Sequence, residues 1–106
     1  MADKSPRRRM LEDSLAEDPS DPFRRYGLAL QCLREGDQEE GRQRLLALID
    51  DHPEEVAAYQ QLGQSYAESN ENGQATAILR AGIGKAILRG ETHAAAEMEG
   101  ILTTLL

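Results

Sequence analysis

The sequence has no tryptophan, one phenylalanine and three tyrosines, so aromatic residues supply only 4 % of the chain. β-branched residues are also few, and the core must therefore consist mainly of leucine, isoleucine and alanine. These residue types suit packed helices better than sheets. The single cysteine, Cys32, excludes a disulfide bond within the chain and is typical of a reducing compartment.

Basic residues and long hydrophobic runs are scarce as well. The chain has 12 lysine and arginine residues against 19 aspartate and glutamate residues. The resulting net charge of −7 argues against duplex nucleic acid as the main partner, because phosphates would be repelled. No apolar run approaches the roughly 20 residues that span a bilayer, and no apolar signal segment follows Met1. We therefore expect a cytoplasmic protein that binds neither nucleic acid nor membrane.

The chain of 106 residues is long enough for one small domain with a modest core. Residues 1–9 are polar with a basic cluster at Arg7, Arg8 and Arg9, and we expect them to form a disordered, solvated arm. Apolar periodicity and turn residues then predict a short helix after residue 10. Five further helices are predicted over about 22–35, 38–51, 54–69, 72–88 and 92–104.

The stretch YQQLGQSYAE, residues 59–68, contains a glycine within a helix face. Tyr59, Leu62, Gly63 and Tyr66 are spaced at offsets of zero, three, four and seven, which is the spacing of one face. A glycine in a helix interior costs about 1 kcal/mol relative to alanine. Gly63 therefore predicts a close approach of a second helix.

Residues of similar size recur at a spacing of 34 along the chain. Five pairs share this register: Pro19 with Pro53, Leu28 with Leu62, Ala29 with Gly63, Gly41 with Ala75, and Leu45 with Leu79. Small residues match small ones and large residues match large ones. A fixed period of this length is typical of a repeat architecture.

This register resembles the tetratricopeptide repeat family, in which 34-residue helix–turn–helix units stack into a superhelix. Tyr59 falls in the family's leading aromatic position, Leu62 and Gly63 in its Leu-Gly pair, and Tyr66 in its tyrosine position. The resemblance implies an all-α solenoid of antiparallel helix pairs, of the small bacterial type. It divides the chain into a half repeat at 10–21, repeats at 22–55 and 56–89, and a capping helix at 90–106.

The sequence departs from the family pattern at several positions. Arg25 stands where the first repeat should have its aromatic residue, and Cys32 stands in the tyrosine position. Gly82 replaces the usual alanine, and together with Gly84 it predicts a bend or a close contact in the helix at 72–88.

The resemblance implies a protein–protein interaction module, an adaptor or scaffold whose peptide or protein partner lies in a concave groove. In the family, the first helix of each repeat lines that groove. The positions implied here are Phe23, Tyr26, Leu30, Leu33, Arg34, Gln60, Gln64, Ala67 and Glu68. Family members that hold the acidic tails of chaperones use Lys, Asn and Arg on these helices. The corresponding residues here are Tyr26, Leu30, Gln61 and Gln64, so the sequence does not support that specificity.

Residues capable of catalysis or metal binding do not form a recognisable motif. Neither His52 nor His93 has a partner at i+3 or i+4 that suits a metal. Cys32 occupies a core position with no base in reach. Gly82 and Gly84 lie inside a helical pattern and no Gly-Lys-Ser/Thr follows them, so they do not make a phosphate loop. We expect no enzyme activity, no metal and no cofactor.

Three alternatives stay open at the level of sequence. The N-terminal helix or the capping helix could cover Phe23, Tyr26 and Leu30 and complete the core. A short solenoid with apolar ends could instead associate with itself as a homodimer. The chain could also be an accessory or regulatory subunit that acts through its basic arm.

Overall fold

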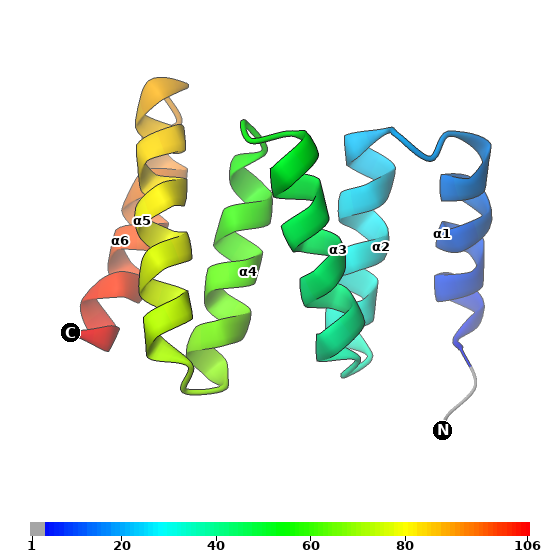
Figure 1. The fold of residues 1–106 in the computed structure, drawn as a ribbon, viewed down its shortest axis with the longest axis horizontal. Helices are drawn as coiled ribbons and strands as arrows, with labels where there is room; N and C mark the ends of the chain where they lie inside the picture. The colour runs from blue at the N-terminus through cyan, green and yellow to red at the C-terminus, as the bar shows by residue number, and fades with distance from the viewer. Residues whose placement is uncertain (1–3) are drawn as a thin grey trace.

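The computed structural model describes residues 4–106, and within them the chain forms six α-helices and no strand (Figure 1). The helices are α1 (Pro6–Glu17), α2 (Pro22–Arg34), α3 (Gln38–Asp51), α4 (Val56–Glu68), α5 (Asn72–Leu88) and α6 (Thr92–Leu105). The predicted all-α fold is confirmed, and the five helices after α1 begin and end within two residues of their predicted bounds. No helix in the described range is both long enough and apolar enough to cross a membrane.

Local sequence signals explain where α2 and α3 begin. The Asp21 carboxylate accepts a hydrogen bond from the N–H of Phe23 (3.2 Å), and Pro22 occupies the first position of α2. The Asp37 carboxylate caps α3 in the same way, since it accepts a hydrogen bond from the N–H of Glu40 (3.3 Å). Both caps agree with the residue types at these positions.

The N-terminal segment differs from the prediction. Residues 1–3 lie outside the described range, but α1 already begins at Pro6, so Arg7, Arg8 and Arg9 are helical. The hydroxyl of Ser5 caps the helix by accepting a hydrogen bond from the N–H of Arg8 (3.0 Å). Arg8 is only 5 % exposed, because carboxylates from the α2–α3 region surround its guanidinium. The prediction of disorder is therefore wrong for residues 6–9, and the prediction of a solvated arm is wrong for Arg8, whereas Arg7 and Arg9 are exposed.

The helices follow one another in space in the order of the chain. α2 packs on α3 and α4 packs on α5, while α3 joins the two pairs by packing on α4. α4 also contacts α2 and α6, so these three helices form one layer, and α3 and α5 lie in front of α2 and α6 in Figure 1. The stack runs from α1 at one end to α6 at the other and measures 38 × 29 × 20 Å.

Glycines allow the paired helices to approach closely. A Cβ atom on Gly63 would lie 2.5 Å from Cδ2 of the fully buried Leu79, across the α4–α5 crossing. A Cβ atom on Gly41 would lie 2.6 Å from Cδ2 of Leu33, across the α2–α3 crossing. The close approach predicted from Gly63 is thus present. Burial of one leucine contributes about 1.5–3 kcal/mol, which offsets the helix-propensity cost of one glycine.

Small and aliphatic side chains fill the core, as the composition predicts. One cluster lies between the first helix pair and α4, and its buried members are Ala29, Leu45, Leu48, Ala58 and Leu62. A second cluster lies between α4, α5 and α6, and its buried members are Val56, Tyr59, Leu79, Ala86, Ala95 and Met98. Because α4 contributes to both clusters, it is the central helix of the stack.

Two arginines 34 residues apart fasten successive helix pairs. Nη2 of Arg8, in α1, lies 2.8 Å from Oε1 of Glu40 and 3.2 Å from Oδ2 of Asp37. Nη1 of Arg42, in α3, lies 2.8 Å from Oε2 of Glu71. Asp37 and Glu71 are themselves 34 residues apart and precede α3 and α5, so the contact repeats with the period of the chain.

The second of these contacts also includes neutral groups of α4. Arg42 also donates from Nε to the hydroxyl of Ser65 (2.9 Å) and from Nη2 to the carbonyl of Ser65 (2.8 Å). Its guanidinium lies over the ring of Tyr66, 4.7 Å from the centroid. The residue 34 positions after Arg42 is Thr76, so the sequence supplies no third arginine to hold α6.

Candidate functional site

The layer formed by α2, α4 and α6 carries two adjoining hollows. The first has a volume of about 290 Å³ and lies between α2 and α4; we call it the α2–α4 hollow. Leucines and Arg34 from α2 face amide, hydroxyl and carboxylate side chains from α3 and α4. Its lining consists of Leu30, Leu33, Arg34, Gln38, Gln61, Gln64, Ser65 and Glu68.

The second hollow has a volume of about 540 Å³ and lies between α4 and α6; we call it the α4–α6 hollow. Its lining consists of Gln60, Gln64, Ala67, Glu68, Glu97, Gly100, Ile101, Thr104 and Leu105. Gln64 and Glu68 border both hollows, and the Gln64 amide donates a hydrogen bond to the Glu68 carboxylate (3.1 Å). The two hollows therefore adjoin across three helices, and we call them together the concave groove.

The structure brings seven of the nine inner residues expected from the resemblance to this groove. These are Leu30, Leu33, Arg34, Gln60, Gln64, Ala67 and Glu68. Phe23 is not among them: its side chain is 82 % exposed, which excludes the alternative that another helix covers it. Tyr26 is half-buried and packs against the core cluster that contains Leu62. Burial raises the pKa of the Tyr26 hydroxyl, against the opposing effects of Gln61 and Arg34.

The sequence-based prediction missed the α6 wall of the groove, because α6 was interpreted only as a cap. The signal was present in the spacing of its residues. Positions 97, 100, 101, 104 and 105 have offsets of zero, three, four, seven and eight, which place them on one helix face. Glu97 and Gly100 make this face less apolar than a buried one, and a partly polar face is typical of a groove wall.

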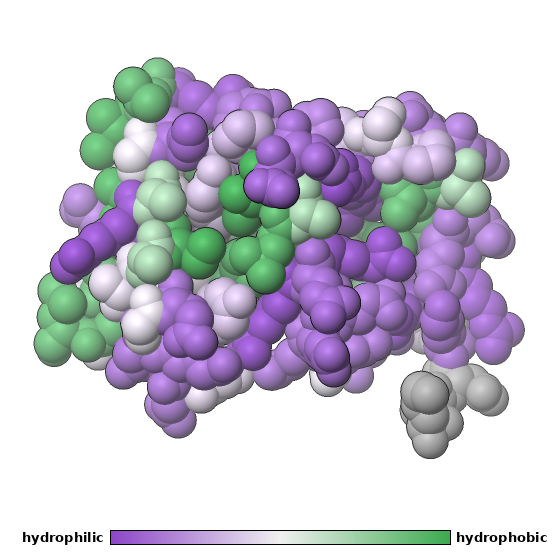
Figure 2. Space-filling model, in the orientation of Figure 1, coloured by the Kyte–Doolittle hydropathy of each residue, from purple (hydrophilic) through white to green (hydrophobic). Residues whose placement is uncertain are grey.

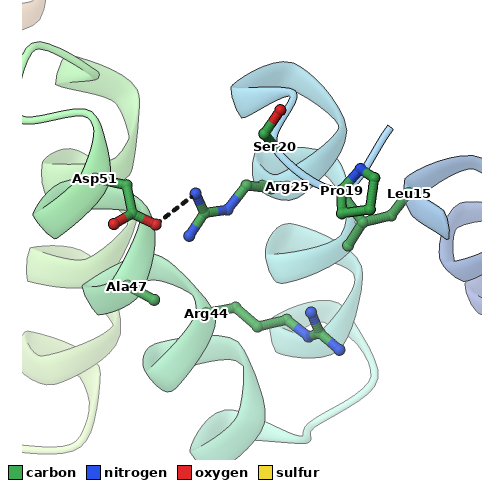
Figure 3. Close-up of a pocket in the computed structure, with 7 residues that line it drawn as sticks. All are labelled: Leu15, Pro19, Ser20, Arg25, Arg44, Ala47 and Asp51. Atoms are coloured by element: carbon green, nitrogen blue, oxygen red, sulfur yellow. Dashed lines mark ion pairs between the residues drawn. The ribbon is translucent and has the colours of Figure 1, made fainter. Parts of the chain in front are cut away.

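A third hollow, of about 410 Å³, opens on another side of α2, between α1 and α3 (Figure 3). Arg25 from α2 and Arg44 from α3 line it, but each guanidinium already holds a carboxylate. Nη1 of Arg25 lies 2.8 Å from Oδ2 of Asp51, and Nε of Arg44 lies 2.9 Å from Oε2 of Glu40. The charges around this hollow are thus balanced by the protein itself.

The position of Arg25 explains why this third hollow exists. In the second repeat the equivalent residue is Tyr59, which is 4 % exposed and donates a hydrogen bond to the carbonyl of Pro53 (2.8 Å). Arg25 turns to Asp51 instead and does not fill the space beside Pro19. We attribute the hollow to this exchange and take the concave groove as the candidate functional site.

Side chains that could carry chemistry are dispersed. Cys32 is fully buried, and burial raises the pKa of its thiol to about 11. His52 lies 3.6 Å from the Glu54 carboxylate, and the exposed His93 lies 3.3 Å from the Glu97 carboxylate. Among residues 4–106, no group of three or more His, Cys, Asp or Glu side chains is placed to hold a metal ion.

The fold of this chain is similar to those of solved tetratricopeptide repeat proteins. The solution structure of a tetratricopeptide repeat domain protein from Salinibacter ruber is 26 % identical, with a TM-score of 0.78, and the match covers 83 % of this chain and 89 % of that chain. A crystal structure of a tetratricopeptide repeat domain protein from the same organism is 25 % identical, with a TM-score of 0.75, and the match covers 80 % and 96 % of the two chains.

A protein from Bordetella parapertussis, 20 % identical with a TM-score of 0.83, shares the fold over 96 % of this chain and 89 % of that chain. No protein-family model matches the sequence, and no curated protein sequence matches it. The 34-residue register, the stacked helix pairs and the solved structures nevertheless agree: the chain is a protein of the tetratricopeptide repeat type.

Proposed function

We propose that this chain is a non-catalytic adaptor or scaffold that holds a peptide or protein partner in the concave groove. The observation that carries the proposal is that two hollows adjoin on the layer of α2, α4 and α6 and share Gln64 and Glu68. Gln60, Gln61 and Gln64 offer amide groups that can pair with the backbone of a peptide. Apolar residues beside them can take its side chains, as in groove recognition of an extended or helical segment.

The comparisons and the placement of reactive residues support this proposal. The Salinibacter ruber neighbours are tetratricopeptide repeat domain proteins, and this repeat architecture creates elongated binding surfaces. The cysteine is buried with a raised pKa, and the two histidines lie at separate helix ends. We further propose a cytoplasmic location, for which a single buried thiol is suited.

A selection experiment tests the proposal. The immobilised protein is offered a random peptide library, and the selected peptides are measured by fluorescence anisotropy against wild type and Leu30→Glu, which places a charge in the α2–α4 hollow. Ala47→Glu, in the exposed lining of the α1–α3 hollow, is the matched control. We expect weaker binding by Leu30→Glu alone, with both variants melting as folded proteins. Peptides bound equally well by Leu30→Glu would place the binding surface elsewhere.

A second candidate function is self-association through the C-terminal end. Ile87 is 63 % exposed, and Leu88 and Leu106 are each 83 % exposed. Figure 2 shows hydrophobic surface at the end of the molecule formed by α5 and α6. Light scattering of wild type and Leu88→Lys tests this candidate, because a homodimer would dissociate in the variant. For the third alternative, regulation through the basic cluster, only Arg7 and Arg9 are exposed, because Arg8 is buried in ion pairs.

A further inference from the structure

We propose that the partner of the concave groove is a basic peptide segment that inserts an aliphatic side chain into the α4–α6 hollow. This inference rests on the proposed function and adds the chemistry of the ligand. It follows from the shape of the hollow, from the sign of the charges around it and from the net charge of the whole chain.

The α4–α6 hollow has room for a side chain because of one glycine. Among the described residues outside its own helix, no heavy atom lies within 4 Å of the position that a Cβ atom on Gly100 would take. Gly63 and Gly82 differ, since a Cβ atom there would collide with neighbouring side chains. Gly100 is therefore not required for helix packing, and its missing side chain leaves space above Ile101 and Leu105. A volume of about 540 Å³ is sufficient for a leucine-sized anchor.

The charges that border this hollow are all negative. Glu68 from α4 and Glu97 from α6 stand on opposite walls, and no lysine or arginine is part of the lining. Glu68 accepts a hydrogen bond from Gln64, and Glu97 lies beside the exposed His93, so both carboxylates remain open to a ligand from the solvent side. A lysine or arginine that flanks the anchor would meet an acid on either wall.

The opposite end of the groove has a different charge. The α2–α4 hollow contains Arg34, which is exposed, and it shares Glu68 with its neighbour. Basic residues of the ligand are therefore favoured at α6 and disfavoured at α2, which places the basic part of a bound segment at the α6 end. The net charge of −7 attracts a basic peptide over longer distances, and this attraction weakens as salt screens it.

Three labelled peptides test the inference: one has basic residues around a leucine, one has acidic residues around the same leucine, and one has the basic residues around a serine. They have the sequences GKRLKRG, GEDLDEG and GKRSKRG and are measured by fluorescence anisotropy. We expect GKRLKRG to bind at least about tenfold more tightly than the other two, a ratio that corresponds to about 1.4 kcal/mol. Its affinity should fall as salt is added.

Two pairs of variants connect this preference to the hollow. Glu97→Lys should weaken binding of GKRLKRG, whereas Glu99→Lys, an equal charge change outside the lining, should act only through net charge and change it less. Gly100→Leu should abolish binding by filling the hollow, whereas Gly84→Leu, also into open space, should leave it unchanged. Both glycine changes favour the helix, so loss of fold does not explain a difference.

The outcomes separate this inference from the proposed function. Library peptides that bind in the groove without a basic or aliphatic preference overturn the inference and leave the proposed function intact. A failure of every library peptide to bind overturns both. If the protein alone forms dimers that Gly100→Leu dissociates, then a second copy occupies the hollow and the inference is wrong.

Discussion

Two glycines in α5 should respond oppositely to the same substitution. A Cβ atom on Gly82 would lie 2.6 Å from Cβ of Tyr59 and 2.7 Å from Sδ of Met98, whereas one on Gly84 would meet open space. The Tyr59 Cβ is fixed by the α4 backbone and cannot rotate away, so Gly82→Ala must displace the backbone. We therefore expect Gly82→Ala to be the less stable variant and Gly84→Ala to be more stable than wild type.

The magnitude follows from two terms. Each substitution gains about 1 kcal/mol of helix propensity, and this gain cancels when the two variants are compared. Overpacking at Gly82 costs about 1–3 kcal/mol, so the free energies of unfolding should differ by about that amount. Relative to wild type, Gly84→Ala should gain up to about 1 kcal/mol, and Gly82→Ala should lie between neutral and a loss of about 2 kcal/mol.

Urea denaturation followed by circular dichroism measures both free energies. In thermal melts, each kcal/mol should appear as a shift of about 4–8 °C in a domain of this size. The m values should agree between variants, which shows that the same surface is exposed on unfolding. Equal midpoints for the two variants would refute the close contact of α5 with α4 and α6 at Gly82.

Further predictions concern single side chains. Arg8→Ala should lower the free energy of unfolding by roughly 1–3 kcal/mol. Amide exchange should show loss of protection in α1, while α4 and α5 stay protected. A uniform loss of protection would contradict a local role for Arg8. Falling pH should also reduce the protection of α1. Hydrogen bonds from Arg44 and Arg8 hold the pKa of Glu40 below its ordinary value of 4.5. The stability that this carboxylate contributes above pH 4.5 is therefore lost on acidification. Arg25→Tyr should fill the α1–α3 hollow and stabilise the fold by about 0.5–2 kcal/mol in urea titrations, and an unchanged midpoint would mean that the hollow cannot close around the ring. Iodoacetamide near neutral pH should modify Cys32 no faster than the protein unfolds, because the raised thiol pKa and burial suppress the thiolate; rapid labelling of the native protein would contradict this.

The sequence predicted those features that depend on local periodicity or on contacts at the repeat spacing. Helix bounds from α2 onward follow from caps and apolar spacing, and Gly63 indicated the close crossing of α4 and α5. The position of Arg8 was not predictable in this way. Three consecutive arginines look like a solvated arm until the carboxylates of Asp37 and Glu40, about 30 residues away, are brought beside one of them.

The walls of the concave groove also differ in how far the sequence predicts them. Its α2 and α4 walls follow from the repeat pattern, because equivalent helices present equivalent faces. Its α6 wall does not, since α6 leaves the register and its orientation depends on packing against α5 through Ala95 and Met98. The large hollow beside Gly100 arises only when α6 is docked, so no local pattern could reveal its volume.

Position 76 holds a threonine where the repeat spacing would place a third arginine, and this affects which helix unfolds first. Within residues 4–106, no side-chain hydrogen bond or ion pair joins a residue of α6 to one of α4 or α5, so along its length this helix is held to them by hydrophobic contacts, and we expect it to detach early. A ligand bound between α4 and α6 would hold α6 against the rest of the stack. Recognition and local folding would then be a single thermodynamic event, with occupancy visible as slower amide exchange along α6.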